Sequence, residues 1–262
     1  KTLAPRNRTH TTTTSTTTTS ESGGGDTTTT TTTESMNVPD VSGAYIDTDS
    51  TDAESLNWLT IADEPSDARI NPTLDGAYAV TTEQEVFPLW CDISSDDKRV
   101  YEVKLRENLQ WSEPYGQMTA EDWVYTIKNV FQGEENWAGY VNAGDWKRGG
   151  EPIPVEKTGK YTFEIQLPEV DPAFPLKPVM WGQYTMPKAL IEPYVEDKDA
   201  EGIKKDETIN NLGYTGNLGP YSFEQWEREA SFIATRNEDY YMHDVDNEEL
   251  PESLQVPETW RD

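Results

Sequence analysis

The sequence predicts a mixed α/β fold, on three observations. Tyr101, Val103 and Leu105 alternate with charged residues, which is the period-2 pattern of a strand with one buried face. A capped amphipathic helix follows at residues 119–131, and a second alternating segment covers residues 161–167. A strand, a helix and a second strand in succession indicate a domain that combines both kinds of element.

Residues 113–116 connect the first strand to the helix. Their sequence, Glu-Pro-Tyr-Gly, predicts a turn, because proline fixes φ and glycine adopts a positive φ readily. Thr119 is the expected N-cap, with Asp122 as its partner in a capping box, and Glu121 adds a second acidic side chain to the first turn. The apolar stripe of the helix consists of Trp123, Ile127, Val130 and Phe131.

The same stretch resembles the signature region of a known family. The run LRENLQWS, a turn closed by Gly116, and the run MTAEDWVY are similar to the signature of the family 5 extracellular solute-binding proteins, the peptide- and nickel-binding components of ABC importers. The departure is Glu113-Pro114-Tyr115, where the family usually has a single Asp before its glycine. The matching positions are Leu105, Arg106, Leu109, Trp111, Ser112, Gly116, Met118, Thr119, Ala120, Asp122, Val124 and Tyr125.

The N-terminal part of the chain is polar. Residues 9–33 are nearly all threonine, which predicts either disorder or an O-glycosylated stalk, and the excess of threonine favours the stalk. Residues 36–54 continue as an acidic linker. Asp47, Asp49 and Asp52 suggest calcium ligands, but the glycine and the distal glutamate of an EF-hand are missing, so a solvated linker is the better interpretation.

The folded part is expected to begin near Ser55. Residues 56–62, LNWLTIA, form an apolar run of strand length and predict a first strand, and the acidic loop after it contains Asp63 and Glu64. In the resembling family this strand belongs to the main lobe and the loop faces the ligand cleft. A looser similarity continues to residue 97, with Asp75 in place of the usual glutamate.

The segment after the signature helix is rich in aromatic residues. Trp137, Tyr140 and Trp146 either line a ligand surface or fill the end of a lobe, and core packing is the better interpretation because large rings bury much area.

Two later patterns match the family in the right order. Residues 186–192 predict a helix with Pro187 in its first turn, and Pro193 limits or kinks that helix. Residues 216–221, GNLGPY, and residues 236–241, RNEDYY, resemble the family's glycine-proline block, with a strand after Pro220 and a turn near Tyr240.

The resemblance implies a two-lobed, periplasmic-binding-protein-like fold of type II that is incomplete at the C-terminus. Residues 1–54 are expected to be stalk and linker. Residues 55–75 and 168–262 are expected to form two segments of the main lobe, and residues 76–167 a smaller accessory lobe with the signature stretch. The second lobe would then be missing, so we expect the chain to be the N-terminal part of a longer protein.

Charge is the dominant compositional feature. The chain has 49 acidic against 21 basic residues and a net charge of −28, which disfavours binding to nucleic acid or anionic lipid. Because concentrated salt shortens the Debye length from about 10 Å to about 3 Å, we interpret this acidity as adaptation to a hypersaline medium, with an acidic mesophilic surface protein as the alternative.

Few residues suggest covalent or metal chemistry. Cys91 is interpreted as a small buried residue, and His10 and His243 have no neighbours typical of a triad or a ligand set. We therefore expect no metal and no cofactor. The sequence contains no apolar run of about 18 residues, so it predicts no membrane span.

The functional hypothesis is a binding protein rather than an enzyme. The resemblance implies capture of a peptide, or another small solute, for delivery to the permease subunits of an ABC importer. The chain is expected to be a monomer at the cell surface, held by lipid on a Cys upstream of Lys1. The alternatives are an extracellular carbohydrate-active enzyme and a structural surface protein. Candidate ligand contacts are Asp63, Glu64, Trp181 and Tyr184.

Overall fold

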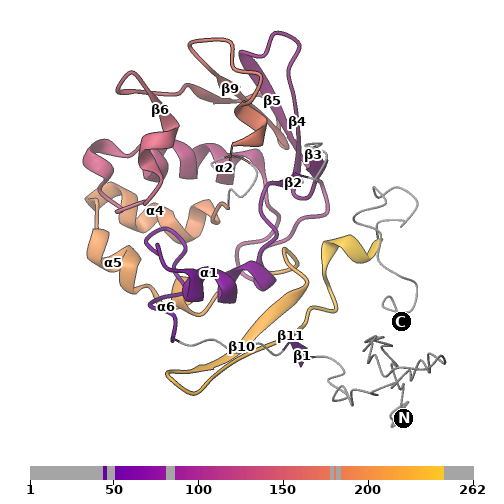
Figure 1. Cartoon of the computed structure of the whole chain (residues 1–262), viewed down its shortest axis with the longest axis vertical. Coiled ribbons are helices and arrows are strands. Elements are labelled where there is room, and N and C mark those ends of the chain that lie inside the picture. Colours follow the sequence, from indigo (N-terminus) through magenta and orange to yellow (C-terminus); the bar gives the residue numbers. More distant parts are fainter. Residues whose placement is uncertain (1–43, 46–50, 81–85, 178–179, 181–183, 245–262) are drawn as a thin grey trace, which may run out of the picture. The chain divides into compact units, whose positions relative to one another are not determined.

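The computed structural model describes residues 44–45, 51–80, 86–177, 180 and 184–244 (Figure 1). The chain divides into a unit Lys1–Gly43 and a unit Ala44–Asp262, and every described residue belongs to the second. The threonine-rich tract, Asp47, Asp49 and Trp181 lie outside the described residues. Within the described part of the chain, no helix combines the length and the apolar character that a membrane span requires.

A four-stranded antiparallel sheet contains the two strands that the sequence predicts. Its order is β4 (Cys91–Ser94), β5 (Val100–Leu105), β9 (Thr162–Gln166) and β8 (Val155–Lys157). In the register of β5 and β9, Val103 faces Phe163 and Tyr101 faces Ile165. All four side chains are buried, so the alternation does mark one core face.

Helix α2 (Ala120–Thr126) covers the buried side of this sheet, where it packs on β8 and β9. Its capping box is formed as predicted, because Thr119 accepts from the first turn and Asp122 accepts from the Thr119 N–H at 2.8 Å. The helix continues as a π-helical turn, η2 (Ile127–Phe131). Its apolar stripe is fully buried, and Trp123 stacks on Phe163 with ring centres 5.8 Å apart.

Three helices follow Tyr184 in the chain. They are α4 (Lys188–Asp197), α5 (Ala200–Lys205) and α6 (Glu207–Asn210). Helix α4 packs on α2 and begins after Pro187, close to the predicted position. It runs past Pro193 to Asp197, so that proline does not end it.

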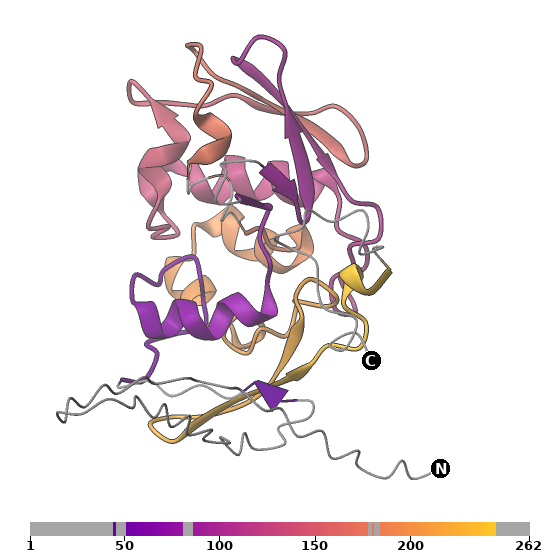
Figure 2. The same ribbon diagram turned by 45° about the vertical axis from the view of Figure 1, so that its right-hand side comes forward.

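A second antiparallel sheet lies at the end of the described unit opposite to the four-stranded sheet in both views (Figures 1 and 2). It contains β1 (Ala44–Tyr45), β11 (Ser231–Arg236) and β10 (Tyr221–Glu227) in that order. The predicted strand after Pro220 is therefore confirmed. Gly219 precedes it because a Cβ there would lie 2.2 Å from the carbonyl carbon of Thr73.

The remaining elements are short. They are α1 (Glu64–Ile70), η1 (Asn71–Thr73), β2 (Tyr78–Val80) paired with β3 (Val86–Pro88), η3 (Glu134–Asn136), η4 (Ala143–Trp146), β6 (Lys147–Arg148) paired with β7 (Glu151–Pro152), η5 (Phe174–Leu176) and η6 (Tyr241–Asp244).

The predicted strand at residues 56–62 is wrong, because this segment forms turns. The side chains of Leu56, Trp58 and Leu59 are buried. In the sequence, these buried turns therefore produce the same apolar run as a buried strand. The Asn57 side chain supplies the hydrogen bonds that a neighbouring strand would otherwise provide: it accepts from the Leu59 N–H at 3.2 Å and donates to the Ile203 carbonyl at 3.0 Å.

The aromatic residues after α2 belong to the core, as predicted. Tyr140 and Trp146 are buried against Phe131, which stacks on Tyr140 with ring centres 4.3 Å apart. Trp137 is partly buried and packs on the same core. Cys91 is fully buried, which agrees with its interpretation as a small core residue.

Candidate functional site

Helix α1 carries two of the four predicted contact residues. The sequence predicted a loop for both residues. In the structure Asp63 is the N-cap of α1 and Glu64 is its first residue. The helix starts here because Asp63 Oδ1 accepts from the Ser66 N–H at 2.9 Å and Pro65 occupies the first turn. In Figures 1 and 2, α1 lies between the β10–β11 hairpin and α4.

Contacts with the preceding segment, together with one buried side chain, hold α1 in place. The Ser66 hydroxyl accepts from the backbone N–H of Glu54 at 2.9 Å, and Arg69 lies 4.0 Å from Asp52. Ile70 is fully buried. The helix is therefore a fixed support for the side chains on its outer surface.

The two acidic candidates differ in availability. Asp63 is engaged as the cap, and its second oxygen, Oδ2, is buried without a hydrogen-bond partner among the described residues. Glu64 is exposed in the first turn, where the helix dipole favours an anion. Glu64 can therefore contact a solute from outside, whereas Asp63 has a structural role.

Tyr184 is half-buried on an aromatic wall. Its ring centre lies 5.7 Å from that of Trp58 and 6.1 Å from that of Trp90. Its hydroxyl donates a hydrogen bond to Asn71 Oδ1 at the C-terminal end of α1. Burial, together with the negative charges of Asp67 and Asp75, raises the pKa of Tyr184, so the phenol stays protonated and remains a donor.

The structure thus brings Tyr184 to one end of α1 and Glu64 to the other, about 10 Å apart along the helix. Between them Asp67 and Asn71 are also exposed, and the Asn71 amide donates to Asp67 Oδ2 at 2.9 Å. We call Glu64, Asp67, Asn71 and Tyr184 the α1 face. Asp67 and Asn71 were not predicted, although their helical spacing from Glu64 was a signal for them.

Asp75, in the segment after α1 and η1, is half-buried and binds two tyrosines near the end of the described chain. Asp75 Oδ2 accepts hydrogen bonds from the hydroxyls of Tyr240 at 2.6 Å and Tyr241 at 2.8 Å. Burial raises the pKa of Asp75 to about 6, although the two hydrogen bonds oppose the rise. The contact joins the segment after α1 to the end of the described chain.

The α1 face is suited to non-covalent, reversible binding of a solute. It offers oxygen acceptors on α1 and an aromatic surface at Tyr184, which suit N–H groups and apolar side chains of a solute.

Elsewhere, burial raises the pKa of the Cys91 thiol, which makes it a poor nucleophile. Among the described residues, no three His, Cys, Asp or Glu side chains are grouped so that they could hold a metal ion.

Comparison with known families gives one match over most of the folded part. Residues 90–253 match the family described as bacterial extracellular solute-binding proteins, family 5, middle part. The matched region includes the signature stretch and the β10–β11 hairpin. A comparison of the sequence with curated proteins finds no match.

Solved structures with a similar fold come from several bacteria. The substrate-binding protein CtaP of an ABC transporter from Listeria monocytogenes is 23% identical with a TM-score of 0.57, over 73% of this chain and 36% of that one. The oligopeptide-binding protein AppA of Bacillus subtilis, solved with a nonapeptide, is 18% identical with a TM-score of 0.57 over the same shares.

NikZ of Campylobacter jejuni, solved with Ni(L-His), is 24% identical with a TM-score of 0.54, over 73% of this chain and 35% of that one. The chain therefore spans little more than a third of the length of these relatives. These likenesses confirm the expected mixed α/β fold of the type II periplasmic binding proteins, of which the described residues form a part.

Proposed function

Because the chain belongs to the bacterial extracellular solute-binding proteins of family 5, we propose that it is part of the substrate-binding component of an ABC importer that captures peptides outside the cell. The observation that carries the proposal is the match of residues 90–253, whose signature stretch folds as strand β5, a turn and the capped helix α2. AppA of Bacillus subtilis, which shares this fold, was solved with a nonapeptide, and this supports peptides as the solute.

The α1 face is proposed as one wall of the solute site. Peptides carry N–H donors and an α-amino group, and Glu64 and Asp67 are exposed acceptors of opposite charge to that amino group. Tyr184 adds an apolar surface for a peptide side chain. Trp181, three residues before it, is proposed to extend this surface. Asp63 is proposed to act through α1, whose start it fixes.

We assign residues 55–75 and 168–262 to the main lobe and residues 76–167 to the accessory lobe. We propose that a second lobe, distinct from both, completes the solute site. The solute would be enclosed when the main lobe and this second lobe close around it by a hinge motion. Permease subunits in the membrane are the proposed recipients, and lipid on an upstream Cys is the proposed anchor.

Titration of peptides into the full-length protein tests this proposal. Isothermal titration with a peptide that binds is expected to show an affinity loss of about tenfold for Glu64→Gln, because a charge-assisted hydrogen bond is removed. Glu196→Gln, a matched exposed glutamate on α4, is the control and should bind like the wild type. Equal affinities for all three proteins would remove Glu64 from the site.

A further inference from the structure

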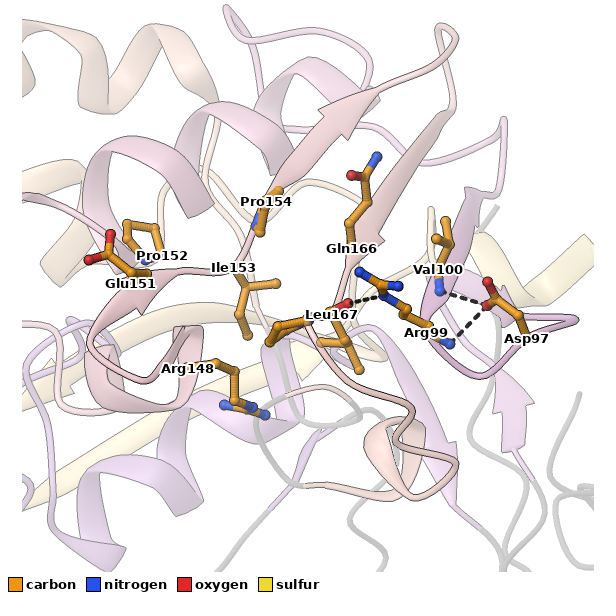
Figure 3. A pocket seen from close by; sticks show the side chains of 11 residues that line it. Asp97, Arg99, Val100, Arg148, Glu151, Pro152, Ile153, Pro154, Gln166 and Leu167 are labelled. Atoms are coloured by element: carbon orange, nitrogen blue, oxygen red, sulfur yellow. Dashed lines mark hydrogen bonds between the residues drawn. The ribbon is translucent and has the colours of Figure 1, made fainter.

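A cavity of about 380 Å³ lies beside the start of β5 and shares no lining residue with the α1 face. Three stretches of chain line it: residues 97–100, residues 148–154 and residues 166–168 (Figure 3). Its volume falls in the range of about 300 to 1,000 Å³ that is typical of small-molecule pockets.

The floor of this cavity is apolar. Ile153 and Leu167 are buried residues, and Val100 adds a third aliphatic side chain. Prolines at positions 152, 154 and 168 form rigid parts of the wall. An apolar ligand surface of a few carbon atoms would therefore be shielded from water here.

Two arginines border the floor from different sides, with Leu167 between them in Figure 3. Arg99 Nε donates to the Leu167 carbonyl at 3.0 Å, and Arg148 Nη1 donates to the carbonyls of Asp145 and Lys147, both at 2.9 Å. These bonds hold both guanidinium groups, and the described residues accept no hydrogen bond from their other N–H groups. In the part of the chain that the structure describes, neither arginine forms an ion pair.

Among the described residues, neither carboxylate at the cavity forms an ion pair with these arginines, although Glu151 stands opposite Arg148 in the β6–β7 pair. Asp97 Oδ1 accepts from the backbone N–H groups of Arg99 at 2.9 Å and Val100 at 2.8 Å, so this side chain stabilises the turn before β5. Glu151 is exposed at the rim. The two acidic and two basic side chains balance, so the cavity is locally neutral in a chain of net charge −28.

We propose that this cavity binds a small organic dicarboxylate. One carboxylate would pair with Arg99 and the other with Arg148, since the planar guanidinium group suits bidentate recognition of a carboxylate. The apolar middle of the ligand would lie over Leu167 and Ile153. This site is separate from the solute site proposed above, so either proposal can fail without the other.

The test is calorimetric titration of the 262-residue chain with linear dicarboxylates from succinate to suberate, at fixed salt. At least one member is expected to bind saturably and more tightly than the monocarboxylate of equal length. Arg99→Gln and Arg148→Gln are each expected to weaken that binding by about tenfold and to abolish the preference for the dicarboxylate. Arg236→Gln, which removes a surface arginine paired with Glu238, is the matched control and should bind like the wild type.

Arg99→Lys keeps the positive charge at that position but loses the fork of donors, and is expected to give an intermediate affinity. Thermal unfolding of every variant establishes that it folds. The proposal is overturned if no dicarboxylate binds saturably, if the monocarboxylate binds as tightly, or if folded Arg99→Gln and Arg148→Gln proteins keep wild-type affinity.

Discussion

A single residue, Asp122, connects two helices. Its Oδ2 closes the capping box of α2 by accepting from Thr119, and its Oδ1 accepts from the Lys188 N–H at 2.9 Å in the first turn of α4. Helix α4 begins after a proline, which has no side-chain hydrogen bond to offer as a cap. Asp122 therefore takes that role for α4 from another helix.

Asp122→Ala is expected to lower the free energy of unfolding by about 2 to 4 kcal/mol, because it removes a cap and leaves two part-buried N–H groups without acceptors. Urea unfolding measures the change. Glu121→Ala, one residue earlier, removes surface ion pairs to Lys157 and Lys188 and should cost under about 1 kcal/mol. Equal losses for the two variants would contradict the double capping role.

Asp75 gives a prediction about pH. Because burial raises its pKa from 3.8 to about 6, the folded state holds this proton more tightly than the unfolded state, and the contribution of Asp75 to stability falls as the pH rises through that window. Asp75→Asn should remove the fall. Its free energy of unfolding relative to the wild type should increase by up to about 3 kcal/mol between about pH 4 and pH 7.

The comparison of Asp75→Asn with the wild type is made by urea unfolding at several pH values. The matched control is Asp96→Asn, an exposed aspartate in the β4–β5 turn, whose difference from the wild type should not follow this window. A pH-independent difference for Asp75→Asn would mean that the carboxylate is not buried as described.

At the scale of the elements, the four-stranded sheet carries a line of like charges. Glu164 on β9 stands directly opposite Glu102 on β5 and Glu156 on β8. We call these three residues the glutamate row. Residues directly opposite each other share a face of the sheet, here the solvent side, and like charges in such positions are destabilising.

Glu164→Gln is expected to stabilise the protein by about 0.5 to 1 kcal/mol at low salt, because it removes the middle charge of the glutamate row. The gain should disappear near about 1 M KCl, where the Debye length is about 3 Å. Urea unfolding at both salts measures it. Glu227→Gln on β10 is the control. Glu227 stands opposite the uncharged Ser231, so its substitution should give no such gain. A gain that is independent of salt would exclude repulsion as its cause.

The elements show what a sequence can and cannot predict. The alternation around Val103 and the capping box at Thr119 are local patterns, and both were predicted correctly. The turns at residues 56–62 were predicted as a strand, because a buried turn and a buried strand can have the same apolar composition. The hydrogen bond that distinguishes them joins the Asn57 side chain to the carbonyl of Ile203, far along the chain. Contacts of this range, such as Tyr184 with Asn71, leave no trace in local periodicity.

For the whole molecule, the charge of −28 leads to the proposal that the protein is adapted to a hypersaline medium. Repulsion among exposed carboxylates opposes folding at low salt and is screened at high salt. We therefore expect the midpoint of thermal unfolding to rise as KCl increases from about 0.2 to about 3 M. A flat profile would contradict the proposal and favour an acidic protein of ordinary salt tolerance.

We propose that this chain belongs to a protein that binds a solute without converting it. Equilibrium dialysis of the full-length protein against a peptide pool, with mass spectrometry of both chambers, tests this proposal. We predict that a subset of peptides accumulates saturably with the protein and is recovered at unchanged mass. Cleaved or modified peptides, or a pool distributed equally between the chambers, would contradict the account.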